Sequence, residues 1–480
     1  MDNASVTSNL IISTDRNSDN LSTNRYNTVS DGPVCLEYQC KAYKRRWWIL
    51  LVFCFASLCQ SLLWNTWSPL LDSLLISYQW TNSFVALIQA VSDAGFIVFA
   101  FPLMYVVETT DLRHGMVIAA SLLVFNMALW NIAFPTNQHW LVAIGSVLNG
   151  VTGCITLAAP SLLSVIWFPT SERTTATAFA SSSSSIGSAV AFLTSPYITG
   201  ANVTASEVKH RDQLSPDFLD KLKIGISNMV YFETGVVVVC FVMVVVYFPP
   251  RPPRPPSISQ TKHRANFFQG LKSIYKNLNF WLMNIAFNLP NGSFNSWLPL
   301  CSMSFRSLGV GEVTAGWIGF FSLVAGVVSS IVVSAIADRM KRRLKLFCVI
   351  LSLLALAALL LLACIQGDYI YIPENNFIGV LYTLCIGASM FINGCVPLFY
   401  ELGCEVTFPV HEGLTNTVLN VVNNLVGMLF FLLFLVPSLA SDTRWMTWTC
   451  VGTCALSIPL LVIMKDRYPR LELELDIANN

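Results

Sequence analysis

From residue 47 onward the chain consists mainly of long apolar runs separated by short polar segments. A helix rises 1.5 Å per residue, so about 20 apolar residues cross a hydrocarbon core of about 30 Å. The runs that are long enough lie at 47–71, 83–107, 115–134, 140–168, 174–198, 226–248, 279–303, 315–337, 344–365, 377–402, 414–435 and 445–464. The pattern predicts an all-α polytopic membrane protein with twelve transmembrane helices in two six-helix halves.

Polar segments flank and divide these halves. Residues 1–43 are rich in Asn, Ser, Thr and Asp, and we expect a disordered cytosolic tail. Residues 249–278 contain a proline-rich run, typical of a stiff spacer but also of an SH3-type ligand, followed by an amphipathic helix suited to a membrane surface. We therefore expect six-helix bundles at 44–248 and 279–465, joined by this linker, and a cytosolic tail at 466–480.

Composition supports the same class of protein. The chain is 54% hydrophobic and 11% charged, whereas soluble proteins carry about 25% charged residues. A net charge of +1 gives no reason to expect a nucleic-acid partner. The sequence has no Walker-type phosphate loop, so a gradient rather than ATP is expected to drive any transport. It also has no paired intramembrane carboxylates and no metal-spaced His, so we predict no enzyme activity, metal site or cofactor.

Basic residues predict the orientation. Most Lys and Arg of the loops fall on one side of the predicted membrane, and the positive-inside rule places both termini in the cytosol. The longest loop on the opposite face contains the sequon Asn202-Val203-Thr204. We therefore expect Asn202 to be glycosylated.

Polar residues recur at helical spacing inside several runs. Such residues are costly in hydrocarbon unless they face a cavity or a partner helix, so the spacing also suits hydrogen bonds between helices or, around Ser185, close packing. An aromatic face beside amides suits a flat polar ring by stacking or a quaternary ammonium by cation–π attraction. The predicted substrate-binding surface comprises Gln60, Trp64, Trp67, Ser185, Asn288, Asn291, Asn295, Asn420 and Asn424.

Asp93 is the acid nearest the middle of a predicted span. Burial in a low-dielectric medium disfavours an ionised carboxylate without a partner, and a carboxyl that can become neutral is what a proton carrier needs. A carboxyl held by hydrogen bonds from a neighbouring helix is the other interpretation. We therefore predict Asp93 as a candidate for proton coupling.

Acidic and basic residues mark the predicted cytosolic ends of four helices. The pattern Phe-Pro-x-x-Glu at 168–172 recurs at 408–412, where an acid in a first helical turn meets the positive end of the helix dipole. An acid-plus-basic loop at 338–343 and a shorter version at 108–113 resemble loops of the major facilitator superfamily. The resemblance implies a gating loop involving Glu108, Arg113, Glu172, Arg173, Asp338, Arg339, Arg343 and Glu412.

Further segments resemble one family within that superfamily, solute carrier family 49, from about residue 44 to about residue 471. They are Trp-Asn-Thr-Trp-Ser-Pro at 64–69, Leu-Asn-Gly at 148–150, Trp-Phe at 167–168, the proline-rich run at 247–257, Ala-Gly-Trp-Ile-Gly-Phe at 315–320, and Glu-Leu at 401–402 leading to Pro-Val-His-Glu-Gly at 409–413. The resemblance implies the major facilitator fold and proton-driven export of pyridoxine from lysosomes by alternating access. A sister branch of the family implies choline or ethanolamine transport, or haem export.

The resemblance also bears on the site. It adds Asn149 to the substrate-binding surface and Glu401 as a second candidate for proton coupling. No His lies within a predicted span, which disfavours haem. The acidic dileucine signal of the lysosomal relative has no counterpart at Leu10-Ile11, so the plasma membrane is the alternative location. A transport-dead receptor is the alternative function, and we expect a monomer whose partners are a small molecule, protons and membrane lipid.

Overall fold

The structure is a computed structural model of the 480-residue chain. It describes residues 43–169, 172–200, 203, 207–208, 214–254, 267–339, 344–408, 410 and 412–465. These residues form helices and the turns between them, with no strand among them, which confirms the predicted all-α class.

The first group of helices runs from α1 to α9. Its members pack as neighbours, α3 against α5, α1 against α7, and α4 against both α5 and α9. Thr81 and Ser215 cap α3 and α9 by accepting hydrogen bonds from the backbone N–H three residues later. The bounds are α1 Arg46–Asn65, η1 Ser68–Leu70, α2 Leu71–Tyr78, α3 Asn82–Thr109, α4 Leu112–Thr136, α5 Trp140–Thr156, α6 Pro160–Trp167, α7 Arg173–Thr199 and α9 Pro216–Val246.

The second group runs from α10 to α18. In it α13 packs against α15, α14 against α15 and α18, and α11 against α16 and α18. The amphipathic helix predicted in the linker is observed as α10, with Ile274 buried. The bounds are α10 Phe267–Lys276, α11 Leu278–Trp297, η5 Leu298–Leu300, α12 Cys301–Phe305, η6 Arg306–Leu308, α13 Glu312–Arg339, α14 Leu344–Gln366, α15 Glu374–Thr407, α16 Glu412–Leu432, η8 Leu433–Leu435, α17 Pro437–Ser441 and α18 Trp445–Ile463.

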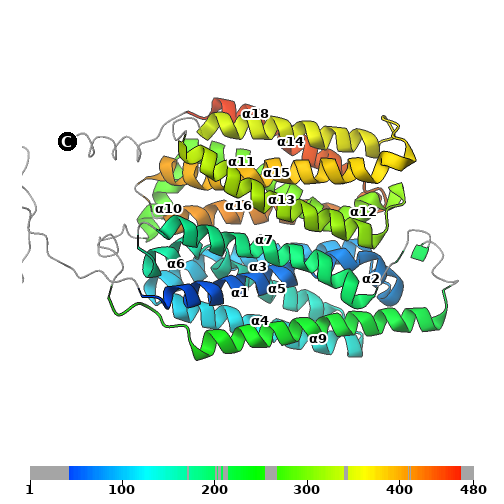
Figure 1. The fold of residues 1–480 in the computed structure, drawn as a ribbon, viewed down its shortest axis with the longest axis horizontal. Helices are drawn as coiled ribbons and strands as arrows, with labels where there is room; N and C mark the ends of the chain where they lie inside the picture. The colour runs from blue at the N-terminus through cyan, green and yellow to red at the C-terminus, as the bar shows by residue number, and fades with distance from the viewer. Residues whose placement is uncertain are drawn as a thin grey trace, which may run out of the picture. The chain divides into compact units, whose positions relative to one another are not determined.

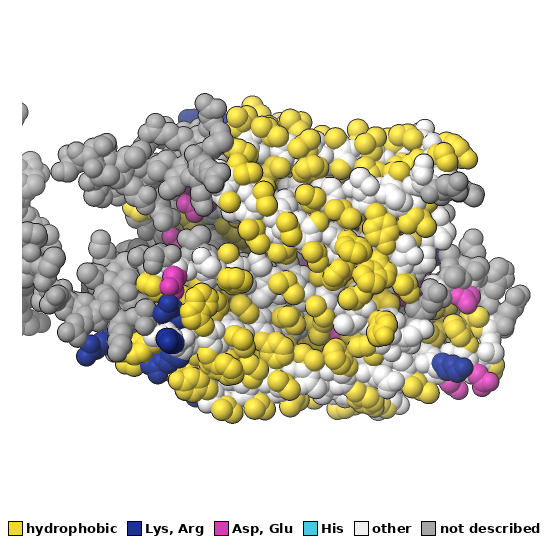
Figure 2. All heavy atoms as spheres, in the orientation of Figure 1, with side chains coloured by type: hydrophobic (Ala, Val, Ile, Leu, Met, Phe, Trp, Pro, Cys, Tyr) yellow, Lys and Arg dark blue, Asp and Glu magenta, His cyan; other side chains and the backbone are white. Residues whose placement is uncertain are grey.

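Nine helical segments within the described residues are long and apolar enough to cross a membrane. A tenth is the pair α5 and α6, which is bent by 41°. Helices α7 and α11 coincide with the two other predicted spans but are rich in Ser, Thr and Asn and do not belong to this set. Hydrophobic side chains cover the middle of the face seen in Figure 2, and Lys and Arg gather near the helix ends. The count of twelve spans and the location of the termini stay predictions.

The two groups lie side by side, with α3 packed against α16 and α7 against α13 (Figure 1). We call the end where α1, α7 and α16 begin the inner end, and the opposite end the outer end. The inner end is the one predicted to face the cytosol.

At the outer end the groups are joined by a buried set of polar contacts. Asp72 of α2 pairs with Arg306 of η6. Glu312, the first residue of α13, accepts hydrogen bonds from the backbone N–H of Asp72 at 3.1 Å and from the hydroxyl of Ser73 at 2.7 Å. A carboxylate of one group thereby caps the N-terminus of a helix of the other. We call Asp72, Ser73, Arg306 and Glu312 the outer clasp.

Candidate substrate cavity

A cavity of about 370 Å³ lies between the two groups of helices. Its walls come from α1, α3 and α7 on one side and from α11, α15 and α16 on the other. The volume falls within the range of small-molecule sites, about 300–1,000 Å³. Most of the side chains that line it are uncharged and polar, so the cavity can hydrogen-bond a small polar ligand at several points.

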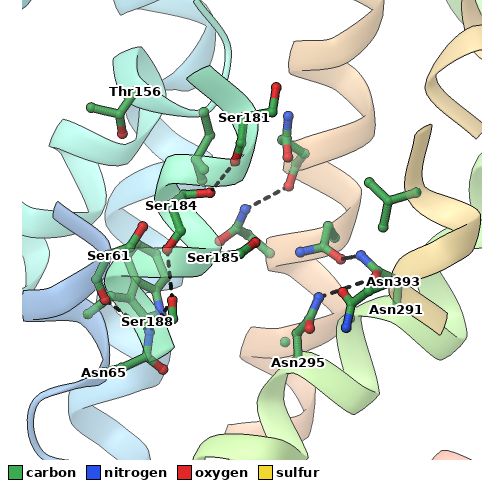
Figure 3. Close-up of a pocket in the computed structure, with 18 of the residues that line it drawn as sticks. Ser61, Asn65, Thr156, Ser181, Ser184, Ser185, Ser188, Asn291, Asn295 and Asn393 are labelled. Atoms are coloured by element: carbon green, nitrogen blue, oxygen red, sulfur yellow. Dashed lines mark hydrogen bonds between the residues drawn. The ribbon is translucent and has the colours of Figure 1, made fainter. Parts of the chain in front are cut away.

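Ser residues of α7 and polar residues of α1 form the first wall. Ser181, Ser184, Ser185 and Ser188 recur at spacings of three and four and face the cavity together (Figure 3). Asn65, the last residue of α1, donates from Nδ2 to Ser188 Oγ at 2.9 Å and thereby holds the two helices in register. Ser188 therefore both contacts α1 and lines the cavity.

Amides of α11 and α16 form the opposite wall. Asn291 Nδ2 donates to Asn423 Oδ1 at 2.7 Å, and Asn295 Nδ2 donates to Asn291 Oδ1 at 3.2 Å (Figure 3). Asn424 Nδ2 donates to the carbonyl of Asn420 at 2.8 Å, and Asn420 Oδ1 accepts from the Tyr400 hydroxyl at 3.1 Å. The Asn291–Asn423 bond joins α11 to α16, the Tyr400–Asn420 bond joins α15 to α16, and all of these amides line the cavity.

An aromatic ring lies on the wall built by α1, α3 and α5. Gln89 of α3 donates from Nε2 to the carbonyl of Trp64 at 3.0 Å and so holds the end of α1 against α3. A Cβ added at Gly153 would lie 3.5 Å from Trp64 Cζ3 and 3.2 Å from Gln60 Nε2. Because residue 153 is glycine, α5 has no side chain here, and the indole of Trp64 occupies the space.

Asp93 supplies a carboxyl to the same wall. Its side chain is 4% exposed, and its Oδ2 has no hydrogen-bond partner among the described residues. A Cβ at Gly427 of α16 would lie 3.0 Å from Asp93 Oδ2. A second buried acid, Glu233 of α9, is used differently, because it accepts a hydrogen bond from Thr66 and does not belong to the cavity wall. Asp93 thus faces the cavity at the junction of the two groups.

The cavity brings together seven of the ten residues predicted to bind substrate, which are Gln60, Trp64, Ser185, Asn291, Asn295, Asn420 and Asn424. The other three lie outside its wall. Trp67 is buried 4.5 Å from Trp130, centroid to centroid, Asn149 is buried in α5, and Asn288 donates to the Asn284 carbonyl one turn earlier in α11. Glu401 is exposed on α15 and is not part of the wall.

Comparison with known proteins places the chain in a family. The family model of the Major Facilitator Superfamily matches residues 53–431. The Solute carrier family 49 member 4 homolog of Xenopus laevis is 30% identical over 441 residues, which cover 91% of this chain and 95% of that protein. The chain belongs to solute carrier family 49 of the major facilitator superfamily.

A lower similarity links the chain to a further relative, and two solved structures have a similar fold. The human Choline/ethanolamine transporter FLVCR2 is 24% identical, with 84% of this chain and 73% of that protein covered. The solved structure of the E. coli fucose:proton symporter FucP is 16% identical with a TM-score of 0.57, over 86% of this chain and 98% of the other. A bacterial homolog of the human lysosomal transporter Spinster is 11% identical with a TM-score of 0.66, over 89% of this chain and 99% of the other. Family and fold are those of transporters and not of enzymes.

In this family 49 chain the predicted gating residues are described in part. Glu172, just before α7, pairs with Arg46 of α1 at 2.8 Å, and Arg173 Nε donates to the Phe168 carbonyl at 3.3 Å. Arg113 is exposed at the start of α4, and Glu412 begins α16. The side chains of Glu108, Asp338 and Arg339, and all of Arg343 and Asn202, lie outside the described residues.

Sequence reasoning missed a repeat that shapes the outer end of the cavity. Asn-Thr-Trp-Ser-Pro-Leu at 65–70 recurs as Asn-Ser-Trp-Leu-Pro-Leu at 295–300. In both copies the α-helix ends, the proline is the second residue of a 3₁₀ turn, and the two turns, η1 and η5, contact each other. The repeat itself was the available signal, and it also identifies Asn65 as a lining residue. Asp72 and Ser73 of the outer clasp follow η1 directly, whereas Arg306 and Glu312 follow η5 only after the short helix α12.

Proposed function

We propose that this family 49 member is a secondary active transporter that exports pyridoxine together with protons from the lysosome by alternating access. The observation that carries the proposal is the cavity between the two helix groups, where Trp64 offers an aromatic face beside Asn and Ser side chains. Stacking suits a flat ring, and the amides and hydroxyls suit its hydroxyl substituents. Asp93 adds a titratable group to the same cavity.

The contacts around the cavity support alternating access. The lining extends to Thr177 and Asn416, which lie in the first two turns of α7 and α16 at the inner end. At the outer end η1 contacts η5 and the outer clasp joins the two groups. A site between two groups that are clasped at one end suits a carrier in which the groups rock about the ligand.

The test is transport by the purified protein in liposomes. With an acidic exterior, a neutral interior and labelled pyridoxine outside, we expect accumulation inside that a protonophore abolishes. Protein-free liposomes and liposomes with equal pH on both sides are the controls. Binding of pyridoxine without movement would instead indicate a receptor, and uptake that ignores both gradient and protonophore would indicate a uniporter.

Choline or ethanolamine is the second candidate substrate. It is favoured by the indole of Trp64 next to uncharged amides, because an aromatic face attracts a quaternary ammonium, and by the similarity to proteins named choline/ethanolamine transporters. Competition decides between the two. Inhibition of labelled choline uptake by unlabelled choline, with no effect of pyridoxine, would favour the second candidate.

Several further proposals accompany this function. Asp93 and Glu401 are the candidates for proton coupling, Asn149, Trp67 and Asn288 support the cavity from behind its wall, and Asn202 carries a glycan. We place the protein in the lysosomal membrane as a monomer, with the plasma membrane as the alternative. Removal of the glycan-dependent gel shift by Asn202→Gln tests the orientation of the chain.

A further inference from the structure

The charges of the cavity restrict what it can bind. Among the described residues that line it, Asp93 supplies a carboxyl, and no Lys, Arg or His is present. An anionic ligand such as a phosphate ester would find no cation to pair with, and its desolvation would be uncompensated. An ionised Asp93 would likewise have no counter-ion within the wall. The positive charge that balances an ionised Asp93 must therefore come from the ligand or from a proton.

Asp93 lines the cavity with a carboxyl that is not satisfied by the described part of the protein. Oδ2 is buried without a hydrogen-bond partner among the described residues, and a Cβ at Gly427 would approach it to 3.0 Å. The same added atom would lie 2.9 Å from the hydroxyl of Ser296. The carboxyl of α3 therefore lies against Gly427 of α16, with Ser296 of α11 beside the same glycine, so a group bound to it is close to both halves of the carrier.

The other titratable groups nearby are already engaged or lie at the helix ends. Tyr400, which also lines the cavity, donates its hydroxyl to Asn420, and Cys154 of α5 donates to the Phe96 carbonyl at 3.3 Å. Helix α11 has no titratable side chain. The elements packed against α3 carry the rest at their ends, namely Arg113 and His114 in α4, Glu412 in α16, and Asp72 and Tyr78 in α2. The groups at the ends of α2, α4 and α16 do not line the cavity.

The aromatic face belongs to the same wall as the carboxyl. A Cβ at Gly153 would lie 3.3 Å from Phe96 Cδ2 and 3.5 Å from Trp64 Cζ3. Phe96 lies one helical turn beyond Asp93 on α3, so the indole of Trp64 is close to the side of α3 that carries the carboxyl. A ring stacked on Trp64 can thus present an edge atom to Asp93.

We propose that Asp93 binds the ring nitrogen of a small heteroaromatic base through one shared proton, so that base and proton cross the membrane together. This inference rests on the proposed function and specifies its substrate chemistry. The proton comes from the acidic side and lies between carboxyl oxygen and ring nitrogen, and the complex has the same net charge whichever atom holds it. On the neutral side the base leaves and the proton is lost to water.

The proposal predicts a preference that depends on one atom of the ligand. An analogue of pyridoxine with CH in place of the ring nitrogen keeps the shape, the stacking and the hydroxyl groups, but it cannot share the proton. A hydrogen bond to a charged group corresponds to a difference of about 10- to 100-fold in affinity. We expect the carbocyclic analogue to inhibit uptake that much more weakly than pyridoxine itself.

The experiment measures inhibition of labelled pyridoxine uptake by unlabelled pyridoxine and by its carbocyclic analogue, in liposomes, at several external pH values. In Asp93→Asn the preference should shrink to a few-fold, as for a neutral hydrogen bond, and should no longer change with pH. Asp93→Glu should keep the full preference. Asp442→Asn, which removes an exposed carboxyl in the loop before α18, is the matched control and should behave as the parent.

Two results would overturn the proposal. One is equal inhibition by both compounds in the parent protein, and the other is an undiminished preference in Asp93→Asn. Both can occur while pyridoxine is still transported, so they leave the proposed function standing. If pyridoxine is not transported at all, the proposed function fails, and quenching of tryptophan fluorescence by the same two compounds measures the preference directly. Size-exclusion profiles of each variant establish that it is folded.

Discussion

Trp64 offers a large apolar surface at the point where the cavity is otherwise amide and hydroxyl. Its ring rests near Gly153, and its position is fixed through Gln89. Trp64→Ala should weaken pyridoxine binding by about 1–3 kcal/mol, the contribution expected of a large aromatic contact, while Trp64→Phe should retain most of it. The dependence of the uptake rate on pyridoxine concentration measures this change in binding. Trp140→Ala, which removes an exposed indole at the start of α5, is the control, and an equal loss there would refute the cavity role of Trp64.

His139 lies in the turn between α4 and α5, outside the spans, and we expect it to make the stability of the fold depend on pH. Its ring is 5.3 Å from Tyr78 and 5.5 Å from Trp80, centroid to centroid, and burial lowers the pKa of its imidazole. The unfolded chain binds a proton at about pH 6.5, so the folded state loses stability as the pH falls from that value through the lower folded pKa. Thermal unfolding in detergent should show a smaller loss between pH 7.5 and 5 for His139→Phe than for the parent. An equal loss of thermal stability in His139→Phe and in the parent would contradict this prediction.

Sequence spacing predicts a common face correctly for one pair of residues and wrongly for another. Asn291 and Asn295 are one turn apart in an unbroken helix, so their spacing placed them correctly on one face. Trp64 and Trp67 have the same kind of spacing, but α1 ends at Asn65 and Trp67 lies in a turn, buried against Trp130. Helical periodicity predicts a common face only while the helix continues. The end of α1 could not be found from hydrophobicity, because the apolar run continues past it.

The outer clasp joins elements of the two helix groups. Removing Arg306 leaves Asp72 buried without its cation, which typically costs about 3–5 kcal/mol. Because this pair joins the two groups, Arg306→Gln should weaken the contact at the outer end and favour states in which that end is open. Arg444→Gln breaks an exposed ion pair with Asp442, and we expect almost no effect there because such pairs contribute about 0–1 kcal/mol.

The measurement is the rate at which a membrane-impermeant maleimide labels Ser68→Cys in η1 from the outer side. Labelling should be faster in combination with Arg306→Gln and unchanged with Arg444→Gln. The parent protein without Ser68→Cys gives the background from the native thiols. Equal labelling rates in all three backgrounds would show that the clasp does not hold the outer end closed.

Apolar runs predicted the positions of the long helices well but not their interruptions. The predicted stretch 47–71 contains α1, η1 and the first residue of α2, and 140–168 contains α5 and α6 with a 41° bend. Hydrophobicity reports burial in lipid or protein, and a turn buried among other helices is as apolar as a helix. The prolines at 69, 160 and 299 were the local signal for the breaks. Glu312 and Asp72 were missed because contacts between the halves depend on tertiary structure.

Proton coupling requires a titratable group that is close to both halves of the molecule, so that its charge affects how they pack. Asp93 lies against Gly427 of α16, which Ser296 of α11 also approaches, whereas Glu401 is exposed on α15. Asp93→Asn fixes a neutral side chain, so uptake should lose its response to the pH gradient and to a protonophore, while exchange of pyridoxine across the membrane continues. Glu401→Gln should keep both responses. Flux measured in acidified liposomes with and without protonophore tests the pair of variants, and full protonophore sensitivity in Asp93→Asn would move the coupling site away from the cavity.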